Sequence, residues 1–415
     1  MDFFVNEIRP EKALLIGVDT GEYDAEALID ELEQLAQTAG AEVFAKTIQR
    51  RKTIDSATFV GSGFLHEIAD TCRTNDIDLI IFDDELTPSQ QRNVEMITDV
   101  RVIDRTLLIL DIFAQRARSR EGKIQVELAQ LKYTLPRLGG KGTQLSRLGG
   151  GIGTRGPGET KLESDRRHIR RRINALEEAL SVVEKNRKVL QNRRKKTGVV
   201  TVSLVGYTNA GKSSLMNALT NAGVLSENKL FATLDPTSRA LTLPDGKEIM
   251  LIDTVGLIRK LPHHLVEAFK STLEEAANAD LVLNIVDGSS SEADEHLKVT
   301  QNILSELNCS GDKILTVVNK CDVMNDDFII DNINDAVKIS ALTGEGFDKL
   351  LSVIKKRLQK DRITLALKIP YDKVGLIAKI RSDGKVLSEE YLDDHILVNA
   401  IVNVRFKKDL EEYII

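Results

Sequence analysis

Tryptophan is absent from the 415 residues of this sequence, and proline and cysteine are scarce, with eight and three occurrences. The cysteines Cys72, Cys309 and Cys321 lie far apart without metal-ligand spacing, and their odd number argues against a disulfide framework. No apolar run approaches the about 20 residues of a membrane span, and no hydrophobic core with a basic flank follows Met1. We therefore expect a cytoplasmic globular protein without a secretory signal, and a loose association with membranes stays open.

Charge is distributed unevenly along the chain. The net charge is −6, yet residues 116–196 hold 22 Lys or Arg and eight Asp or Glu, so this segment carries +14 and the remainder −20. A segment this basic within an acidic protein indicates an anionic partner. The plainer interpretation, a solvated helical face, stays open.

Residues 1–104 alternate strand-like and helix-like runs, which predicts an α/β subdomain at the N-terminus. Strands separated by helices of 10–15 residues pair in parallel through right-handed crossovers. The expected strands are residues 13–18, 41–45 and 78–82, and the expected helices are residues 25–39, 63–74 and 88–98.

Two seams with a seven-residue repeat follow, a pattern typical of coiled-coil helices. Between them, nine of the twenty residues 139–158 are glycine, whose bare backbone N–H groups can approach phosphates closely. We expect a helical hairpin over 105–196 with a glycine-rich basic loop at 139–158; a second helix of about 35 residues would be roughly 50 Å long. The first seam comprises Leu107, Leu110, Ala114, Ala117, Glu121, Ile124, Leu128, Leu131 and Leu135, and the second comprises Leu162, Ile169, Ile173, Leu176, Leu180, Val183, Arg187 and Leu190.

A second α/β region is expected at residues 197–361, and a small α+β domain at residues 362–415. The C-terminal domain should contain a strand, a helix, two further strands and a short final helix. The first four of these elements are expected at residues 363–369, 371–381, 385–391 and 395–404.

The strand expected at Val199–Val205 runs directly into a phosphate-binding sequence. Residues 206–213 match the GxxxxGK[ST] loop, and a helix follows as that loop requires. The glycines let backbone N–H groups wrap a phosphate, and the helix N-terminus adds a favourable dipole. Lys212 would place its charge between the β- and γ-phosphates, and Ser213 would give Mg²⁺ a hydroxyl ligand. The loop residues expected to bind nucleotide are Gly206, Tyr207, Thr208, Asn209, Ala210, Gly211, Lys212 and Ser213.

Three further signals each follow an expected strand, at the carboxyl end where open α/β sheets bind ligands. Asp253 would hold Mg²⁺ through water, and the Gly256 N–H would meet the γ-phosphate. The Asp322 carboxylate can accept two N–H groups from guanine, a pair that adenine does not offer. A backbone N–H within residues 340–342 could hold the guanine O6. The nucleotide-binding residues in these signals are Asp253, Thr254, Val255, Gly256, Asn319, Lys320, Cys321, Asp322, Ser340, Ala341 and Leu342.

A hydroxyl between the loop and Asp253 should complete the Mg²⁺ shell when the γ-phosphate is present, and such a segment orders with GTP and loosens after hydrolysis. Thr233 is preferred to Thr237, a choice that spacing alone does not settle. Lys212, Thr233 and Gly256 are the expected catalytic residues.

Position 257 holds leucine where Ras-like enzymes have a glutamine that orients the attacking water. Neither Leu257 nor Ile258 can position water, so we predict slow intrinsic hydrolysis that a partner accelerates. Asn209 matches an asparagine that binds K⁺ in some P-loop GTPases, and K⁺ there could neutralise developing charge much as an arginine finger does.

Residues 199–360 resemble the translation-factor-like P-loop GTPases, and three stretches resemble the HflX family of ribosome-associated GTPases. The resemblance implies an α/β subdomain and a helical linker before the GTPase domain, binding to the large ribosomal subunit, and separation of stalled or stressed ribosomes into subunits. It also implies that Thr233 is the switch threonine and that Phe231, Ala232, Thr233, Leu234 and Asp235 contact nucleotide. The three stretches are Val102-Ile103-Asp104-Arg105-Thr106 running into Phe113-Ala114-Gln115-Arg116-Ala117-Arg118, Gln125-Val126-Glu127-Leu128-Ala129-Gln130-Leu131, and Gly150-Gly151-Ile152-Gly153-Thr154-Arg155-Gly156-Pro157-Gly158-Glu159.

We therefore predict an α/β P-loop protein that is monomeric when free, a Mg²⁺-dependent GTPase that binds ribosomal RNA of the large subunit. Two alternatives stay open: an RNA-modification or RNA-processing GTPase, and a signalling switch whose partner is a protein. The residues expected to contact RNA are Lys141, Arg147, Arg155, Arg166, Arg167, Arg170 and Arg171.

Overall fold

The computed structural model describes residues 9–138, 157–196, 199–220, 230–231, 234–260, 273–274, 277–324, 336–360 and 362–415. The chain divides into two compact units. Unit 1 comprises residues 1–181 together with two segments from later in the chain, 227–235 and 259–270, and unit 2 comprises the remainder. Two segments that flank predicted nucleotide motifs in the sequence therefore belong to the N-terminal unit.

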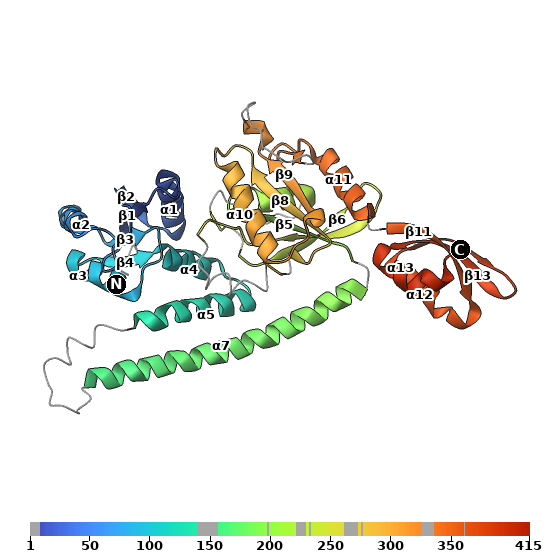
Figure 1. Cartoon of the computed structure of the whole chain (residues 1–415), viewed down its shortest axis with the longest axis horizontal. Helices are drawn as coiled ribbons and strands as arrows, with labels where there is room; N and C mark the ends of the chain where they lie inside the picture. The colour runs from blue at the N-terminus through green and yellow to red at the C-terminus, as the bar shows by residue number, and fades with distance from the viewer. Residues whose placement is uncertain are drawn as a thin grey trace, which may run out of the picture. The chain divides into compact units, whose positions relative to one another are not determined.

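Unit 1 is built on a four-stranded parallel sheet in the order β2-β1-β3-β4 (Figure 1). Its central strands are buried over Leu14–Ile16 and Leu79–Phe82, as the apolar runs of a parallel sheet require. The predicted alternation and parallel pairing are confirmed. The elements are β1 (Lys12–Asp19), α1 (Ala25–Ala39), β2 (Glu42–Arg50), α2 (Ser62–Asn75), β3 (Leu79–Phe82), α3 (Pro88–Thr98) and β4 (Arg101–Asp104).

The run predicted as one seam from Leu107 to Leu135 forms two helices. Helix α4 (Arg105–Arg116) packs against α1, β3 and β4, so its apolar residues belong to the sheet's core. Helix α5 (Arg120–Arg137) begins after the N-cap Ser119, whose hydroxyl oxygen accepts the Gly122 N–H at 2.8 Å. The apolar spacing continues across this break, which is why the sequence pattern did not reveal it.

Helix α5 packs against α7 (Pro157–Lys196), which has 40 residues and is about 60 Å long at 1.5 Å per residue. The predicted repeat supplies the contact between them. Next to this contact, Arg172 donates two hydrogen bonds to the Glu127 carboxylate, from Nε to Oε1 at 2.7 Å and from Nη2 to Oε2 at 2.8 Å. The buried residues of the contact are Ile124, Leu128, Ile173 and Leu176, flanked by Leu131, Leu135, Ile169, Ala179 and Leu180.

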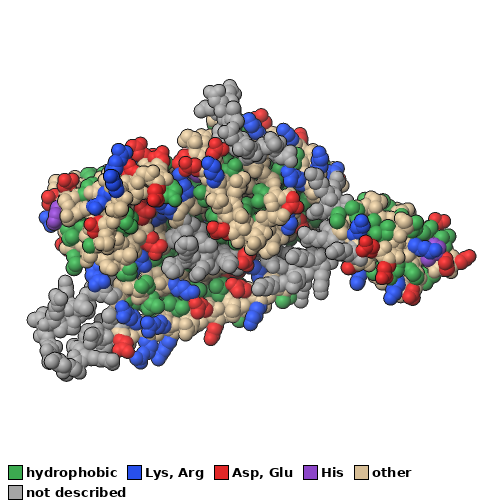
Figure 2. Space-filling view, in the orientation of Figure 1, with side chains coloured by type: hydrophobic (Ala, Val, Ile, Leu, Met, Phe, Trp, Pro, Cys, Tyr) green, Lys and Arg blue, Asp and Glu red, His purple; other side chains and the backbone are tan. Residues whose placement is uncertain are grey.

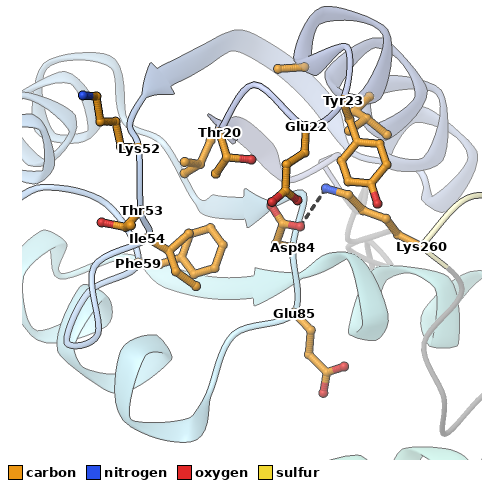
Figure 3. A pocket seen from close by; sticks show the side chains of 13 residues that line it. Thr20, Glu22, Tyr23, Lys52, Thr53, Ile54, Phe59, Asp84, Glu85 and Lys260 are labelled. Carbon is orange, nitrogen blue, oxygen red and sulfur yellow. Dashed lines mark hydrogen bonds and ion pairs between the residues drawn. The ribbon is translucent and has the colours of Figure 1, made fainter.

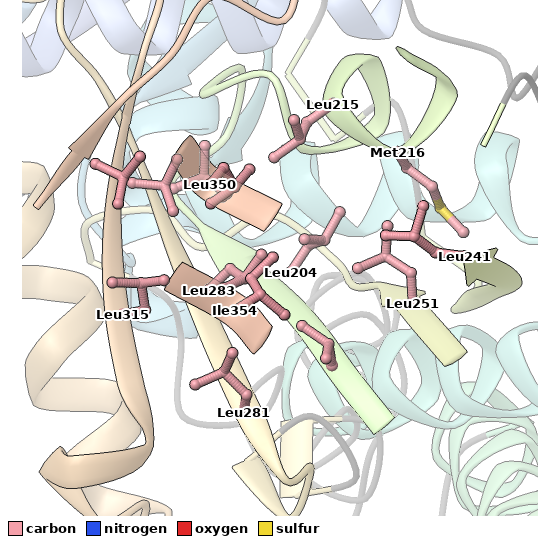
Figure 4. Close-up of a cluster of buried hydrophobic side chains, with 14 of the residues drawn as sticks. Leu204, Leu215, Met216, Leu241, Leu251, Leu281, Leu283, Leu315, Leu350 and Ile354 are labelled. Carbon is pink, nitrogen blue, oxygen red and sulfur yellow. The ribbon is translucent and has the colours of Figure 1, made fainter. Parts of the chain in front are cut away.

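Unit 2 contains a six-stranded sheet in the order β10-β9-β8-β5-β7-β6. Strand β6 pairs antiparallel with β7, and the other neighbours pair in parallel. Leu204, Leu251 and Leu283 from three adjacent strands lie in its core, against Leu215 and Ile354 from the helices (Figure 4). The elements are β5 (Thr201–Gly206), α8 (Lys212–Thr220), β6 (Thr237–Thr242), β7 (Glu248–Asp253), β8 (Leu281–Asp287), α10 (Ala293–Glu306), β9 (Ile314–Asn319), β10 (Val337–Lys338) and α11 (Phe347–Lys360).

The C-terminal residues form a three-stranded antiparallel sheet in the order β11-β13-β12. The predicted order of elements is confirmed, although residues 371–373 form a 3₁₀ turn, so the helix begins later than predicted. Among the described residues, no helix is both long and apolar enough to cross a membrane. The elements are β11 (Arg362–Pro370), α12 (Gly375–Asp383), β12 (Lys385–Tyr391), β13 (His395–Asn403) and α13 (Lys407–Leu410).

A cluster of buried charges lies at the carboxyl end of the unit 1 sheet. Arg105 is only 2% exposed, and its Nη1 donates to Asp83 Oδ1 at 2.8 Å. Its Nη2 donates to Glu31 and, at 3.2 Å, to the backbone oxygen of Arg259. Helix α4 is thereby bonded to the segment that begins at residue 259.

Lys260 enters the same cluster beside a cavity of about 500 Å³ (Figure 3). Its Nζ donates to Asp83 Oδ2 at 2.9 Å and to Asp84 Oδ1 at 2.7 Å. Burial alone would lower the pKa of Lys260, but the two carboxylates outweigh it and raise that pKa. The ammonium therefore stays charged and compensates the buried Asp83.

We predict that Arg105→Met lowers the free energy of unfolding of unit 1 by about 3–5 kcal/mol, because Asp83 stays buried and, within the described part of the chain, keeps only Lys260 as a cationic partner. Hydrogen exchange of β3 and β4 amides in increasing denaturant measures the loss. Arg101→Met is the matched control: its pair with Glu11 is half exposed, and its loss should cost about 0–1 kcal/mol. Equal losses in the two variants would contradict the assignment.

Candidate nucleotide-binding site

The loop after β5 adopts a backbone that requires glycine at two positions. A Cβ on Gly206 would lie 2.3 Å from the Ile285 carbonyl oxygen, so β5 can approach β8 here only without a side chain. Gly211 has φ +91°, and a Cβ there would lie 2.2 Å from Asn319 Nδ2. Asn209 also has a positive φ, 60°, which asparagine tolerates better than most residues. The GxxxxGK[ST] glycines are therefore fixed by packing as well as by ligand chemistry.

Lys212 begins α8 and points back into this loop. Its side chain is 6% exposed, and Nζ donates to the carbonyl oxygens of Gly206 at 3.0 Å and Tyr207 at 2.8 Å. Burial lowers the pKa of Lys212 to about 8, with the Asp253 carboxylate opposing the change. The site thus holds a desolvated ammonium where the loop backbone curls, as the phosphate-binding prediction expects.

Ser213 and Asp253 bring two oxygen ligands together at the end of β7. Ser213 Oγ donates to Asp253 Oδ2 at 2.6 Å, and Asp253 is fully buried. Mg²⁺ favours oxygen ligands and often takes one or two from protein while keeping waters. A hydroxyl and a carboxylate this close, beside Lys212, therefore fit a Mg²⁺ ion that also binds phosphate.

The residues after Asp253 lie against the loop. A Cβ on Gly256 would lie 2.8 Å from Thr208 Cγ2 and 3.3 Å from Lys212 Nζ, so glycine is needed next to the ammonium. Leu257 pairs with the loop backbone: its N–H donates to Gly206 O at 3.1 Å and its carbonyl accepts the Thr208 N–H at 2.8 Å. The Leu257 side chain is 1% exposed. The buried, apolar side chain offers no hydrogen-bonding group to the site, and its effect on hydrolysis stays a prediction.

The predicted guanine signals converge through Asn319. Its Nδ2 donates to Ala210 O at 2.9 Å, and its Oδ1 accepts the Ala341 N–H at 2.9 Å. One side chain therefore ties the phosphate loop to the 340–342 turn. Asp322 is exposed, as a carboxylate that meets a ligand from solvent would be.

Two neighbours of the site were missed in the sequence. Asp287, at the end of β8, accepts Lys320 Nζ at 2.6 Å and helps to hold Lys320 in a left-handed conformation with φ 64°. The position of Asp287 at the end of an apolar strand could have identified it as a site residue from the sequence. His296 on α10 stacks on Tyr207 with ring centroids 3.8 Å apart and planes 14° apart. No local pattern predicts that pair, because the two residues are distant in sequence.

The segment predicted to contact nucleotide between the loop and β6 lies in unit 1. Phe231 packs on Phe113, and Asp235 accepts hydrogen bonds at the start of α5. Ala232 and Thr233 lie outside the described residues. A nucleotide contact from this segment stays a prediction.

The RNA contacts also stay predictions. Four of the predicted residues lie on α7, where Arg167, Arg170 and Arg171 are exposed and Arg166 is half-buried. The predicted loop residues outside the described part are Lys141, Arg147 and Arg155.

Family models match consecutive parts of the chain. They are described as GTP-binding GTPase N-terminal over residues 26–114, GTP-binding GTPase Middle Region over 116–194, 50S ribosome-binding GTPase over 201–320 and HflX C-terminal domain over 329–411.

Similar proteins named GTPase HflX cover nearly the whole length. The chain is 50% identical over 405 residues to the one from Caldanaerobacter subterraneus subsp. tengcongensis, covering 98% of this chain and 94% of that protein. It is 50% identical to the one from Lacrimispora saccharolytica, covering 94% and 93%. It is 44% identical to the one from Escherichia coli K12, covering 87% and 86%. With the P-loop geometry above, these matches show that the chain is a GTPase and belongs to the HflX family.

Proposed function

We propose that this GTPase binds the large ribosomal subunit and, under the control of GTP, separates stalled or stressed ribosomes into subunits. The proposal is carried by one observation: the same chain contains a domain that matches the 50S ribosome-binding GTPase model and a long helix with a basic face. The ribosome is the anionic partner that this charge distribution fits.

The site residues have roles that follow from their chemistry. Lys212 Nζ would exchange its two carbonyl acceptors for β- and γ-phosphate oxygens, which keep the ammonium charged. Ser213 and Asp253 would hold Mg²⁺, Asp253 through water, and Thr233 would complete the shell. When bound, Mg²⁺ would neutralise negative charge that develops on the phosphates during hydrolysis.

Hydrolysis should be slow in the free protein. Leu257 is buried and hydrogen-bonded through its backbone to the phosphate loop, so it supplies no group to orient water. The ribosome would supply or rearrange the missing group, and the protein would then act as a timer. K⁺ held beside Asn209 is a further proposed source of positive charge.

Guanine selectivity would come from Asp322, which can accept two N–H groups of the base. Asn319 supports it by joining the phosphate loop to the 340–342 turn, one of whose N–H groups would meet O6. Lys320, fixed by Asp287, would cover the base.

Ribosomal RNA would be contacted by the basic side of α7. Arg167, Arg170 and Arg171 are exposed on consecutive turns, and Figure 2 shows Lys and Arg side chains gathered along this part of the helix. Arginine suits this role because its guanidinium forms bidentate bonds to phosphate. The other predicted RNA contacts are Arg166 on the same helix and, outside the described residues, Lys141, Arg147 and Arg155.

Sedimentation of ribosomes with the protein tests the proposed function. Separation into subunits is expected with GTP and with a non-hydrolysable GTP analogue, but not with GDP, because the triphosphate form would be the active one. Lys212→Ala, which removes the buried ammonium from the phosphate loop, should leave ribosomes intact. Intact ribosomes under every nucleotide condition would refute the proposal. Separation with GTP but not with the analogue would mean that ribosomes come apart only after GTP has been hydrolysed.

Arg170→Gln combined with Arg171→Gln tests the RNA contact. Each lost phosphate contact should lower the slope of log affinity against log salt by about 0.7–0.9, so ribosome affinity falls most at low salt. Lys349→Gln with Lys356→Gln removes the same charge from two exposed positions of α11 and should change neither quantity. An unchanged slope in the arginine variant would favour a protein partner over RNA, and an equal change in the control would contradict a contact specific to α7.

A further inference from the structure

The carboxylate of Asp235 sits on the N-terminus of helix α5. Its Oδ2 accepts the backbone N–H groups of Arg118 at 2.8 Å and Ser119 at 2.7 Å, and its Oδ1 accepts the Ser119 hydroxyl. The Ser119 hydroxyl oxygen in turn accepts the Gly122 N–H. A carboxylate from more than a hundred residues away thus satisfies donors that helix α5 leaves open at its start.

Gly122 explains why α5 tolerates a glycine in its first turn. A Cβ at this position would lie 2.5 Å from Asp235 Oδ1 and 3.2 Å from Ser119 Oγ. Glycine lowers helix stability relative to alanine, so its presence here is a cost to α5. The gain is room for the carboxylate.

An aromatic contact holds Phe231, four residues before Asp235. Phe231 packs edge-on against Phe113 of α4, with ring centroids 4.8 Å apart and planes at 89°. Both rings are 2% exposed, and Leu230 and Leu234 are also buried. Phe231 therefore contacts α4 through an apolar pair, and Asp235 contacts the start of α5 through a charged group.

The covalent path from this junction to the nucleotide site is short. Asp235 is followed by Pro236 and then by Thr237, which begins β6 and pairs with Asp253 of β7. Thr233, the proposed switch threonine, precedes Asp235 by two residues, a span of at most about 7 Å. If Thr233 moves to reach Mg²⁺ and the γ-phosphate, Asp235 must move with it and lose its hydrogen bonds to the start of α5, or the backbone between the two residues must change conformation.

We propose that Asp235 is a positioning residue that couples the nucleotide state to the α5–α7 pair, by releasing the N-terminus of α5 when GTP draws its segment toward the phosphates. The proposal rests on the proposed role of Thr233 and extends it to the basic helix, because α5 packs on α7 along the buried contact at Ile124 and Leu176. The same movement would therefore reach the side chains that are proposed to bind RNA.

Hydrogen exchange of the peptide spanning 116–126 is the test. In the wild type, exchange of these amides should be about tenfold faster with a non-hydrolysable GTP analogue than with GDP, because Arg118 and Ser119 lose their acceptor. Asp235→Asn should reduce the difference to below about twofold, since it weakens the bond in both states. Asp245→Asn, an exposed aspartate in the turn before β7, should behave as the wild type.

Gly122→Ala separates coupling from stability. Alanine favours the helix, so a purely structural role predicts slower exchange with the nucleotide response intact. The proposal predicts that the response is lost, because the methyl group displaces the Asp235 carboxylate. Gly63→Ala near the start of α2 is the matched control: a Cβ there meets no atom within 4 Å, and the response should persist.

An exchange peptide that does not respond to nucleotide in the wild type, or that still responds in Asp235→Asn, overturns the inference even if ribosomes are separated. A response that depends on Asp235 in a protein that leaves ribosomes intact upholds the inference while refuting the proposed function.

Discussion

The buried ammonium of Lys212 is the constraint around which the nucleotide site is arranged. A desolvated cation needs acceptors, and Gly206, Tyr207 and Asp253 supply them by hydrogen bond or charge. The loop can curl around the ammonium only because glycine occupies the positions where a Cβ would meet a neighbouring strand or side chain. Phosphate oxygens would replace these acceptors at little cost in desolvation, because the water has already been removed from Lys212.

The link from this site to the rest of the molecule runs through short segments that belong to unit 1. One is held at α4 and α5 through Phe231 and Asp235, and the other enters the Arg105 cluster through Lys260. Both leave the nucleotide motifs within a few residues. In the proposed timer these segments would carry the nucleotide state, and the one held through Asp235 reaches α5, which packs on the basic helix α7.

Local sequence patterns predicted the elements whose physics is local. The apolar runs of unit 1 gave its parallel sheet, and the phosphate loop with its strand and helix was identified from residues 206–213. The break before α5 was missed because the apolar spacing continues across it. The new helix starts there because Ser119 caps it and because Asp235, which is distant in sequence, accepts hydrogen bonds at its N-terminus. The His296–Tyr207 stack was missed for the same reason: tertiary contacts leave no periodic signal.

The most direct test of the account is the affinity for a non-hydrolysable GTP analogue, measured with and without large ribosomal subunits. Coupling between two sites is reciprocal, so a nucleotide that prepares the protein for the ribosome must itself be bound more tightly on the ribosome. A gain of about fivefold or more is expected with subunits present. Equal affinities in the two conditions would contradict it.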